Sequence, residues 1–134
     1  MMGETLAQTI CGNRVEYKPG HWFNSAKFMD IEYQTYGLVF GERSRPNYEK
    51  HFHWKHEDDT KCITIAYDKS NNKFLGINTF GIRMRHEVFD RWLTEKRDVD
   101  YVMNNLSEAN FDPEFYKRFE TDILFAYNQQ LQIA

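Results

Sequence analysis

Two aromatic rings, an amide and a hydroxyl follow one another at Trp22, Phe23, Asn24 and Ser25, immediately before a segment with strand-like alternation. Aromatic side chains supply apolar area, and amide and hydroxyl groups supply oriented hydrogen bonds, which together form the usual lining of a small-molecule pocket. With Tyr36, these residues are candidates for the mouth of an apolar pocket in which Asn24 and Ser25 guide a ligand. The same aromatics would equally serve as core or interface residues.

A second group with possible chemistry contains histidines. Glu49, His51 and His53 alternate on one face of an expected strand, and His56 follows closely. Histidine and carboxylate are metal ligands, but a spacing of two residues on a strand does not by itself give a chelating geometry. The pattern favours a solvated strand face, and a metal-dependent enzyme ranks last among the hypotheses.

Motifs that identify a free-standing enzyme are absent from the sequence. The seven glycines fit neither GxGxxG nor GxxxxGK[ST], so the chain has no dinucleotide fingerprint and no P-loop of its own. No GxSxG elbow occurs, and Cys62 lies in the most apolar expected strand, where a thiol is usually inert. Arg83, Arg85 and His86 form a basic corner that could meet a nucleotide phosphate or an acidic partner surface, but a charged corner of this kind is more often solvated, which is the interpretation we favour. We therefore expect no catalytic residue in this chain.

The composition limits the classes of partner. A length of 134 residues suits one domain, and a net charge of −3 with dispersed Lys and Arg argues against nucleic acid. No run of 18 apolar residues and no secretory leader occur, so we expect no membrane insertion. Cys11 and Cys62 form no CxxC pair, which favours a cytoplasmic setting. An aromatic share of 16% suggests more packing surface than a minimal monomer needs.

The candidate residues must be positioned by the expected strands. Residues 3–10 have helical spacing, with Gly12 as a stop. Alternation and β-branched residues then predict four strands, at residues 29–39, 50–56, 60–67 and 73–82. Gly76 lies inside the last of these, which predicts a bulge or a close backbone approach.

The first expected strand has a clear two-sided pattern. The apolar side chains of Met29, Ile31, Tyr33 and Val39 are expected to face the core, and those of Asp30, Glu32 and Gln34 to point away.

Helical spacing returns after Arg83. It predicts one helix through Val88 and Trp92, and a second that begins after Asp98 as N-cap. A third is expected to begin with Asp112 as N-cap and Pro113 at the first helical position, and to continue through Phe115, Phe119, Ile123 and Tyr127. Four strands with hairpin-length connections followed by three helices predict a two-layer α+β fold, with an antiparallel sheet of about four strands and about three C-terminal helices on one face.

Three segments resemble a known family. "SAKFMDIEYQTYG" and the later "KFLGINTFGIRMRHEVFDRWL" are similar to the C-terminal domain of FAD-dependent pyridine nucleotide oxidoreductases, in particular the ferredoxin reductase-like branch. The matching positions are Asp30, Gln34 and Gly37 in the first segment and Gly76, Asn78, Arg83 and Arg85 in the second. The N-terminal "MGETLAQTICG" resembles the closing helix of the FAD-binding domain in such enzymes.

The resemblance implies a role beside a flavin. In this family the domain is an antiparallel sheet with helices alongside, which forms the homodimer interface and covers the flavin ring. It implies that Trp22 or Phe23, with Asn24 and Ser25, contacts FAD. The two nucleotide-binding domains are missing, so the resemblance implies that FAD is not bound by this chain alone. The His-Pro pair of the disulfide-reductase branch is absent, so thiol-disulfide chemistry is not implied.

Two functional hypotheses follow. In the first, residues 1–18 are a tail of the FAD-binding domain type and residues 19–134 are a single α+β domain, the accessory and dimerisation domain of a flavin-dependent NAD(P)H oxidoreductase. Its expected partners are a second copy, as a homodimer, and flavin- and NAD(P)-binding domains in a longer form or a partner chain. In the second, the chain is a stand-alone small-ligand-binding protein.

Overall fold

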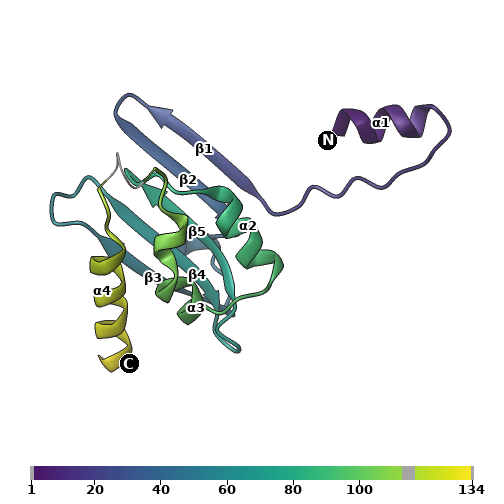
Figure 1. Ribbon diagram of the computed structural model, residues 1–134. Coiled ribbons are helices and arrows are strands. Elements are labelled where there is room, and N and C mark those ends of the chain that lie inside the picture. The colour runs from purple at the N-terminus through teal and green to yellow at the C-terminus, as the bar shows by residue number, and fades with distance from the viewer. Residues whose placement is uncertain (1, 113–116, 134) are drawn as a thin grey trace.

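The chain folds into one antiparallel sheet with helices on one side (Figure 1). The computed structural model describes residues 2–112 and 117–133. The helices are α1 (Met2–Ile10), α2 (His86–Thr94), α3 (Val99–Asn104) and α4 (Glu120–Ile133), and the strands are β1 (Phe23–Phe28), β2 (Ile31–Gly37), β3 (Glu49–Lys55), β4 (Cys62–Asp68) and β5 (Phe74–Phe80). Short 3₁₀ turns lie at Glu42–Ser44 and Leu106–Ala109.

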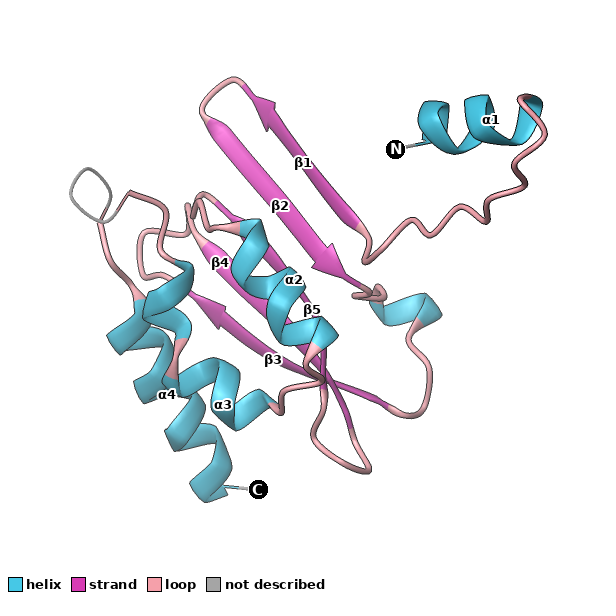
Figure 2. Ribbon diagram, turned by 45° about the vertical axis from the view of Figure 1, so that its right-hand side comes forward, coloured by secondary structure: helices cyan, strands magenta, loops and turns pink. Residues whose placement is uncertain are grey.

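The five strands are hydrogen-bonded in the order β1-β2-β5-β4-β3, and every neighbouring pair is antiparallel. Figure 2 shows α2, α3 and α4 on the same side of this sheet. α2 packs on β2 and β5, whereas α4 packs on β3 and α3. The predicted α+β class is confirmed, with five strands instead of about four.

The additional strand is β1, which begins at Phe23 in the aromatic cluster. Residues 29–39 do not form one strand, because Met29 and Asp30 are the two-residue turn of a β1–β2 hairpin in which Phe28 pairs with Ile31. Met29 has a φ of 53°, in the left-handed region that a tight turn requires. Alternation alone does not mark this turn, since Met29, which takes the left-handed conformation, is not a typical hairpin-turn residue.

The two faces of β2 are also the reverse of the prediction. Gln34 and Tyr36 are buried, whereas Met29 is 94% exposed and Ile31 is 56% exposed. The Tyr36 hydroxyl donates to the carbonyl of Met84 at 3.3 Å, and the backbone N–H of Met84 donates to Gln34 Oε1 at 2.8 Å. Gln34 can be buried because its amide satisfies this buried backbone group.

The core lies between the sheet and its helices. It contains Phe52 and Trp54 of β3, Ile63 and Ile65 of β4, and Ile77 of β5. The helices contribute a second set, which includes Phe89, Trp92, Val102, Met103, Ile123 and Tyr127. Phe52 and Trp54 alternate with the histidines along β3 and form the face of this strand that points into the core.

The predicted starts of the last two helices differ in outcome. α3 begins as predicted, because the Asp98 carboxylate caps it by accepting from the backbone N–H of Tyr101 at 2.7 Å. The predicted start of the last helix at Asp112 is wrong: Asp112 has a φ of 40°, unlike the extended backbone of an N-cap, and α4 begins only at Glu120. Pro113 and Phe115 lie outside the described residues. The carbonyl of Phe119 accepts the first helical hydrogen bond, from the N–H of Ile123 at 3.0 Å, while its ring packs 6.0 Å from that of Trp54.

The connection from β2 to β3 is a crossover and not a hairpin. Residues 38–48 leave β2 and reach β3 at the far edge of the sheet. The N–H of Leu38 donates to the carbonyl of Leu75 at 3.0 Å, and a Cβ on Gly76 would lie 2.8 Å from the N and O atoms of Leu38. The register of β4 and β5 also shifts beside Gly76. The predicted bulge or close approach at Gly76 is thus confirmed.

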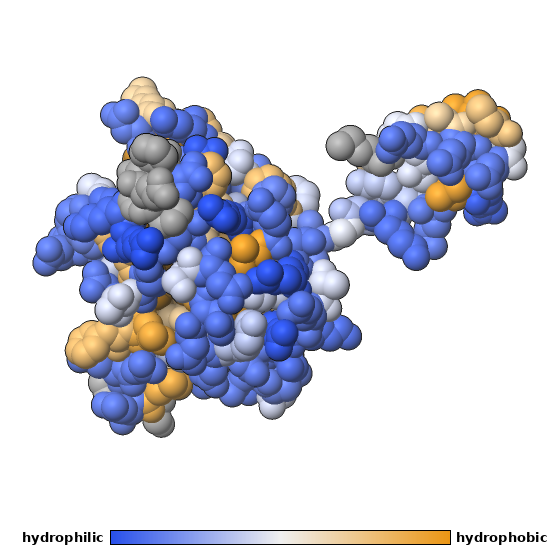
Figure 3. All heavy atoms as spheres, viewed as in Figure 1, coloured by the Kyte–Doolittle hydropathy of each residue, from blue (hydrophilic) through white to orange (hydrophobic). Residues whose placement is uncertain are grey.

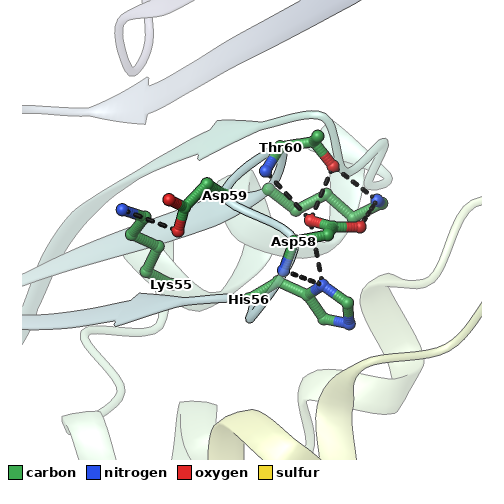
Figure 4. A network of polar contacts seen from close by, with 6 residues as sticks. Lys55, His56, Asp58, Asp59 and Thr60 are labelled. Atoms are coloured by element: carbon green, nitrogen blue, oxygen red, sulfur yellow. Dashed lines mark hydrogen bonds and ion pairs between the residues drawn. The ribbon is translucent and has the colours of Figure 1, made fainter.

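The β3–β4 turn is fixed by a polar network (Figure 4). The Asp58 carboxylate accepts from the N–H of Thr60 at 2.9 Å, from its hydroxyl at 2.7 Å and from Lys61 Nζ at 2.9 Å. The hydrogen bonds from Lys61 and Thr60 hold the pKa of Asp58 well below its usual range. Lys55 and Asp59 form a further ion pair across the turn at 2.8 Å.

The helix α1 lies away from the sheet, at the end of an extended connection (Figure 1). It buries no residue, and Leu6 and Ile10 are exposed. The predicted helix at residues 3–10 is confirmed, and Gly12 follows it with a φ of 89°. Across residues 2–112 and 117–133, no helix is long and apolar enough to cross a lipid bilayer.

Candidate functional site

A groove of about 920 Å³ lies where the segment before β1 meets the end of the sheet and α2. Its lining is mainly apolar and includes Tyr17, Trp22, Phe23, Leu38, Phe74 and Leu93. A second hollow of about 430 Å³ shares Trp22, Phe23 and Leu93 with the groove, and Tyr36 and His86 also line it. Both volumes are in the range of small-molecule sites.

Trp22 and Phe23 lie together at this groove, as the sequence predicts for a pocket mouth. Trp22 is 61% exposed, and its carbonyl accepts from the N–H of Gly37 at 2.8 Å, which fixes the backbone against the end of β2. The Phe23 ring stacks on Tyr36, with 5.0 Å between ring centroids and 15° between planes. Trp22 therefore presents a largely exposed side chain beside an ordered aromatic stack.

Asn24 and Ser25 are not part of the lining of either hollow. Successive strand residues point to opposite faces, so Asn24 points away from Phe23. The Asn24 amide Nδ2 donates to the Tyr33 hydroxyl at 2.9 Å on the face without helices. Ser25 pairs with Gln34 further along the hairpin. The role of these two residues as polar guides therefore has no support from their placement.

The structure adds two histidines to the site, neither of which the sequence pattern assigns to it. His86, at the start of α2, stacks on Phe23 with 5.0 Å between ring centroids. His21 Nε2 lies 3.3 Å from the Thr94 hydroxyl, which links the segment before β1 to the end of α2. The sequence singles out His86 only as part of the basic corner. The β2–β5 pairing is what brings that corner next to β1.

The electrostatics of the site are set by burial and by short polar contacts. Burial, with the nearby carboxylates of Glu87 and Glu32, raises the pKa of Tyr36 above its usual range, so its hydroxyl remains a neutral donor. On the other side of the groove, hydrogen bonds from the hydroxyl and N–H of Ser70 lower the pKa of Asp68. Lys73 and Lys96 also line the groove, so its lining carries two ammonium groups beside the Asp68 carboxylate.

The histidine strand makes pairwise contacts. His51 Nε2 pairs with the buried Glu49 carboxylate, and His53 Nδ1 lies 2.9 Å from the Thr64 hydroxyl. His56 leaves the strand face, contacting Asp58 at 2.9 Å and packing its ring 5.2 Å from that of Phe119. Among the described residues, no three His, Cys, Asp or Glu side chains come together as a metal site would require.

Cys62 is half-buried on the sheet face opposite the helices, not in the core. Burial raises the pKa of its thiol, which favours the less nucleophilic protonated form. Cys11 is exposed, and neither cysteine forms a disulfide.

Comparison with known proteins gives a likeness in structure only. No protein-family model matches the chain, and no curated protein matches it. Among solved structures, an FAD-dependent pyridine nucleotide-disulphide oxidoreductase from Desulfovibrio vulgaris is similar, with a TM-score of 0.57 and 12% sequence identity. The likeness covers 96% of this chain and 30% of that one, so this chain spans about a third of its neighbour's length. At this identity the likeness concerns the fold.

Proposed function

We propose that this chain is the accessory and dimerisation domain of a flavin-dependent NAD(P)H oxidoreductase, related to the C-terminal domain of the ferredoxin reductase-like branch. The observation that carries the proposal is the fold likeness, which extends over 96% of the chain to part of a larger FAD-dependent oxidoreductase. In this role the chain positions and shields the flavin, while the cofactor supplies the hydride chemistry. No side chain of this domain is proposed as catalytic.

The groove suits one part of FAD and not the other. The exposed indole of Trp22 and the ordered ring of Phe23 offer the flat, apolar surface that covers an isoalloxazine ring. A pyrophosphate is usually held at a Gly-rich turn that opens a helix, and the sequence has no such motif. We therefore propose that FAD is held mainly by other domains and that Trp22 and Phe23 cover its ring.

The exposed apolar residues fit partner domains. α1 presents Met2, Leu6 and Ile10 without burying any of them, and we propose that residues 1–18 pack on a flavin-binding domain as its closing helix. Residues 19–134 then form the domain itself. The tip of the β1–β2 hairpin, with Phe28 and Met29, is also apolar and exposed (Figure 3). We propose that a second copy covers part of this surface in a cytoplasmic homodimer.

The experiment is the isolation of the native polypeptide with an antibody against the β3–β4 turn, which contains neither of the positions changed below. The proposal predicts a polypeptide, or a stable complex, well above the 16.2 kDa of this chain that carries flavin absorbance. Trp22→Ala in that protein should lower its flavin content, because the ring loses its cover. Phe125→Ala removes an equally exposed aromatic on α4 and should leave the flavin content unchanged. A native 16.2 kDa protein without flavin or flavoprotein partner would rule the proposal out.

The second candidate is a stand-alone small-ligand-binding protein, which the 920 Å³ groove favours. It predicts that the isolated chain binds a small aromatic ligand and that Trp22→Ala weakens this binding. Free FMN and FAD, titrated while Trp fluorescence is recorded, separate the two candidates. Saturation at micromolar flavin supports the second, and its absence supports the first.

A further inference from the structure

A separate hollow of about 420 Å³ lies on the sheet face opposite the helices. Its wall is the crossover, with Val39, Phe40 and Gly41, and it shares no lining residue with the groove at Trp22. Its volume is sufficient for a small metabolite.

The floor of this hollow is a row of polar residues across the sheet. His53 pairs with Thr64, Thr64 with Asn78, and Asn78 with Thr35. Directly paired residues point to the same face, and Phe52 and Trp54 on either side of His53 are buried beneath the helices. The row therefore points away from the helices. Three of its members, His53, Thr64 and Asn78, line the hollow from three adjacent strands.

One acceptor in this floor is unused. Asn78 Oδ1 is buried and has no hydrogen-bond partner among the described residues. By contrast, the Thr64 hydroxyl contacts His53 Nδ1 at 2.9 Å. A buried amide oxygen without a partner is unfavourable, so it favours a ligand that brings an N–H or O–H donor.

Glu49 holds the wall against the floor. Its side chain is fully buried, and its Oε1 accepts from the N–H of Phe40 in the wall at 3.1 Å. The same oxygen contacts Nε2 of His51, which also lines the hollow. A buried residue thus holds the loop and the strand together. The hollow is already ordered before a ligand binds, so binding has a small cost in conformational entropy.

Side chains of both charges line the hollow. Arg45 contributes a guanidinium, the side-chain group best suited to bind a carboxylate with two hydrogen bonds, and Glu42 contributes a carboxylate. A simple anion would leave Asn78 Oδ1 without a donor and would face Glu42. A simple cation would face Arg45.

We propose that this hollow binds a small zwitterion, an α-amino acid. Its carboxylate pairs with Arg45, and its ammonium group donates to Asn78 Oδ1 and faces Glu42. The site is independent of the flavin-facing groove.

The test is a titration of the full ¹⁵N-labelled chain with each of the protein-forming L-amino acids, followed at the amides of Thr64 and Asn78. Acetate and methylammonium serve as probes with a single charge. We expect at least one amino acid to saturate these shifts, and both single-charge probes to bind at least about tenfold more weakly, as expected for loss of one charge-assisted contact.

Variants localise the site. Arg45→Gln should weaken binding by about tenfold to a hundredfold, and Asn78→Ala by about tenfold. Arg43→Gln is the matched control, because Arg43 belongs to the same loop but does not line the hollow. The proposal is overturned if no amino acid saturates the shifts, if acetate binds as tightly as the best amino acid, or if both arginine variants weaken binding equally.

Discussion

At the scale of single residues, the geometry depends on a few positions where backbone and side chain meet closely. Gly76 lets the crossover lie directly on β5, and Gln34 satisfies a backbone N–H beneath the corner that leads to α2. Neither residue is large or apolar. Both nevertheless determine how β2 connects to the rest of the sheet.

Gly76→Ala should lower the free energy of unfolding by about 2–3 kcal/mol, the upper range for overpacking. The added Cβ would lie 2.6 Å from the carbonyl oxygen of Tyr36 and 2.8 Å from backbone atoms of Leu38, which cannot move without displacing β2. Urea denaturation measures the change. Gly41→Ala in the same crossover is the control, because no atom lies within 4 Å of its new Cβ. Equal effects of the two substitutions would contradict the close approach at Gly76.

Gln34→Leu should cost about 1–3 kcal/mol, because the N–H of Met84 would remain buried without an acceptor. Gln129→Leu, at an exposed position on α4, should change stability by no more than about 0.5 kcal/mol. Chemical denaturation of both variants tests this contact. If Gln34→Leu were neutral, the buried hydrogen bond would not be the reason for the reversed faces of β2.

At the scale of elements, the sequence predicts the structure correctly where the pattern depends only on neighbouring residues. The Asp98 cap, the α1 helix and the special role of Gly76 follow from a few neighbouring residues. The β1–β2 hairpin does not, because its turn uses Met29 in a left-handed conformation and the buried residues of β2 are polar or aromatic. The sequence does not predict the crossover either, because strand order depends on contacts between residues that are far apart in the sequence.

The residues of the candidate site also divide into those that the sequence predicts and those that only tertiary packing brings together. Trp22 and Phe23 were identifiable as neighbours with the chemistry of a pocket lining, and they do line the groove. Asn24 is predicted as part of the same pocket because it is their neighbour in the sequence. Strand alternation instead turns its side chain to the other face of the sheet. His21 and His86 join the site through tertiary packing, for which a single sequence carries little signal.

The Asp98 cap gives a prediction for α3. Asp98→Ala should lower the free energy of unfolding by about 1 kcal/mol, because the N–H of Tyr101 loses its acceptor. Asp98→Asn should restore most of the loss, since asparagine is an equally good N-cap. Thermal or urea unfolding of the pair measures the cap. An Asn variant as unstable as the Ala variant would mean that the charge of Asp98, and not its cap, is important.

At the scale of the whole molecule, buried tyrosines connect its parts. The Tyr127 hydroxyl of α4 donates to the Asp100 carboxylate of α3 at 2.7 Å, and that of Tyr36 donates to the corner before α2. Burial is the main cause that raises the pKa of both hydroxyls above their usual range. Their protonated form is therefore part of what joins helices to helices and to the sheet.

Stability should fall as the pH rises above about 10. There the unfolded chain loses its tyrosine protons, while the folded chain keeps those of Tyr36 and Tyr127 until a higher pH. The unfolded state then binds fewer protons, so the free energy of unfolding decreases with pH. Urea titrations between about pH 9 and 11 should show this slope, and the double variant Tyr36→Phe/Tyr127→Phe should show a smaller one. An unchanged slope in the double variant would assign the effect to other groups.

The most direct test of the proposed role is the mass and absorption spectrum of the purified full chain, measured by size-exclusion chromatography with light scattering. An accessory domain that dimerises and leaves FAD to other domains predicts a dimer of the 16.2 kDa chain without flavin absorbance. A monomer that carries flavin or another chromophore would contradict this role and support the stand-alone binding protein.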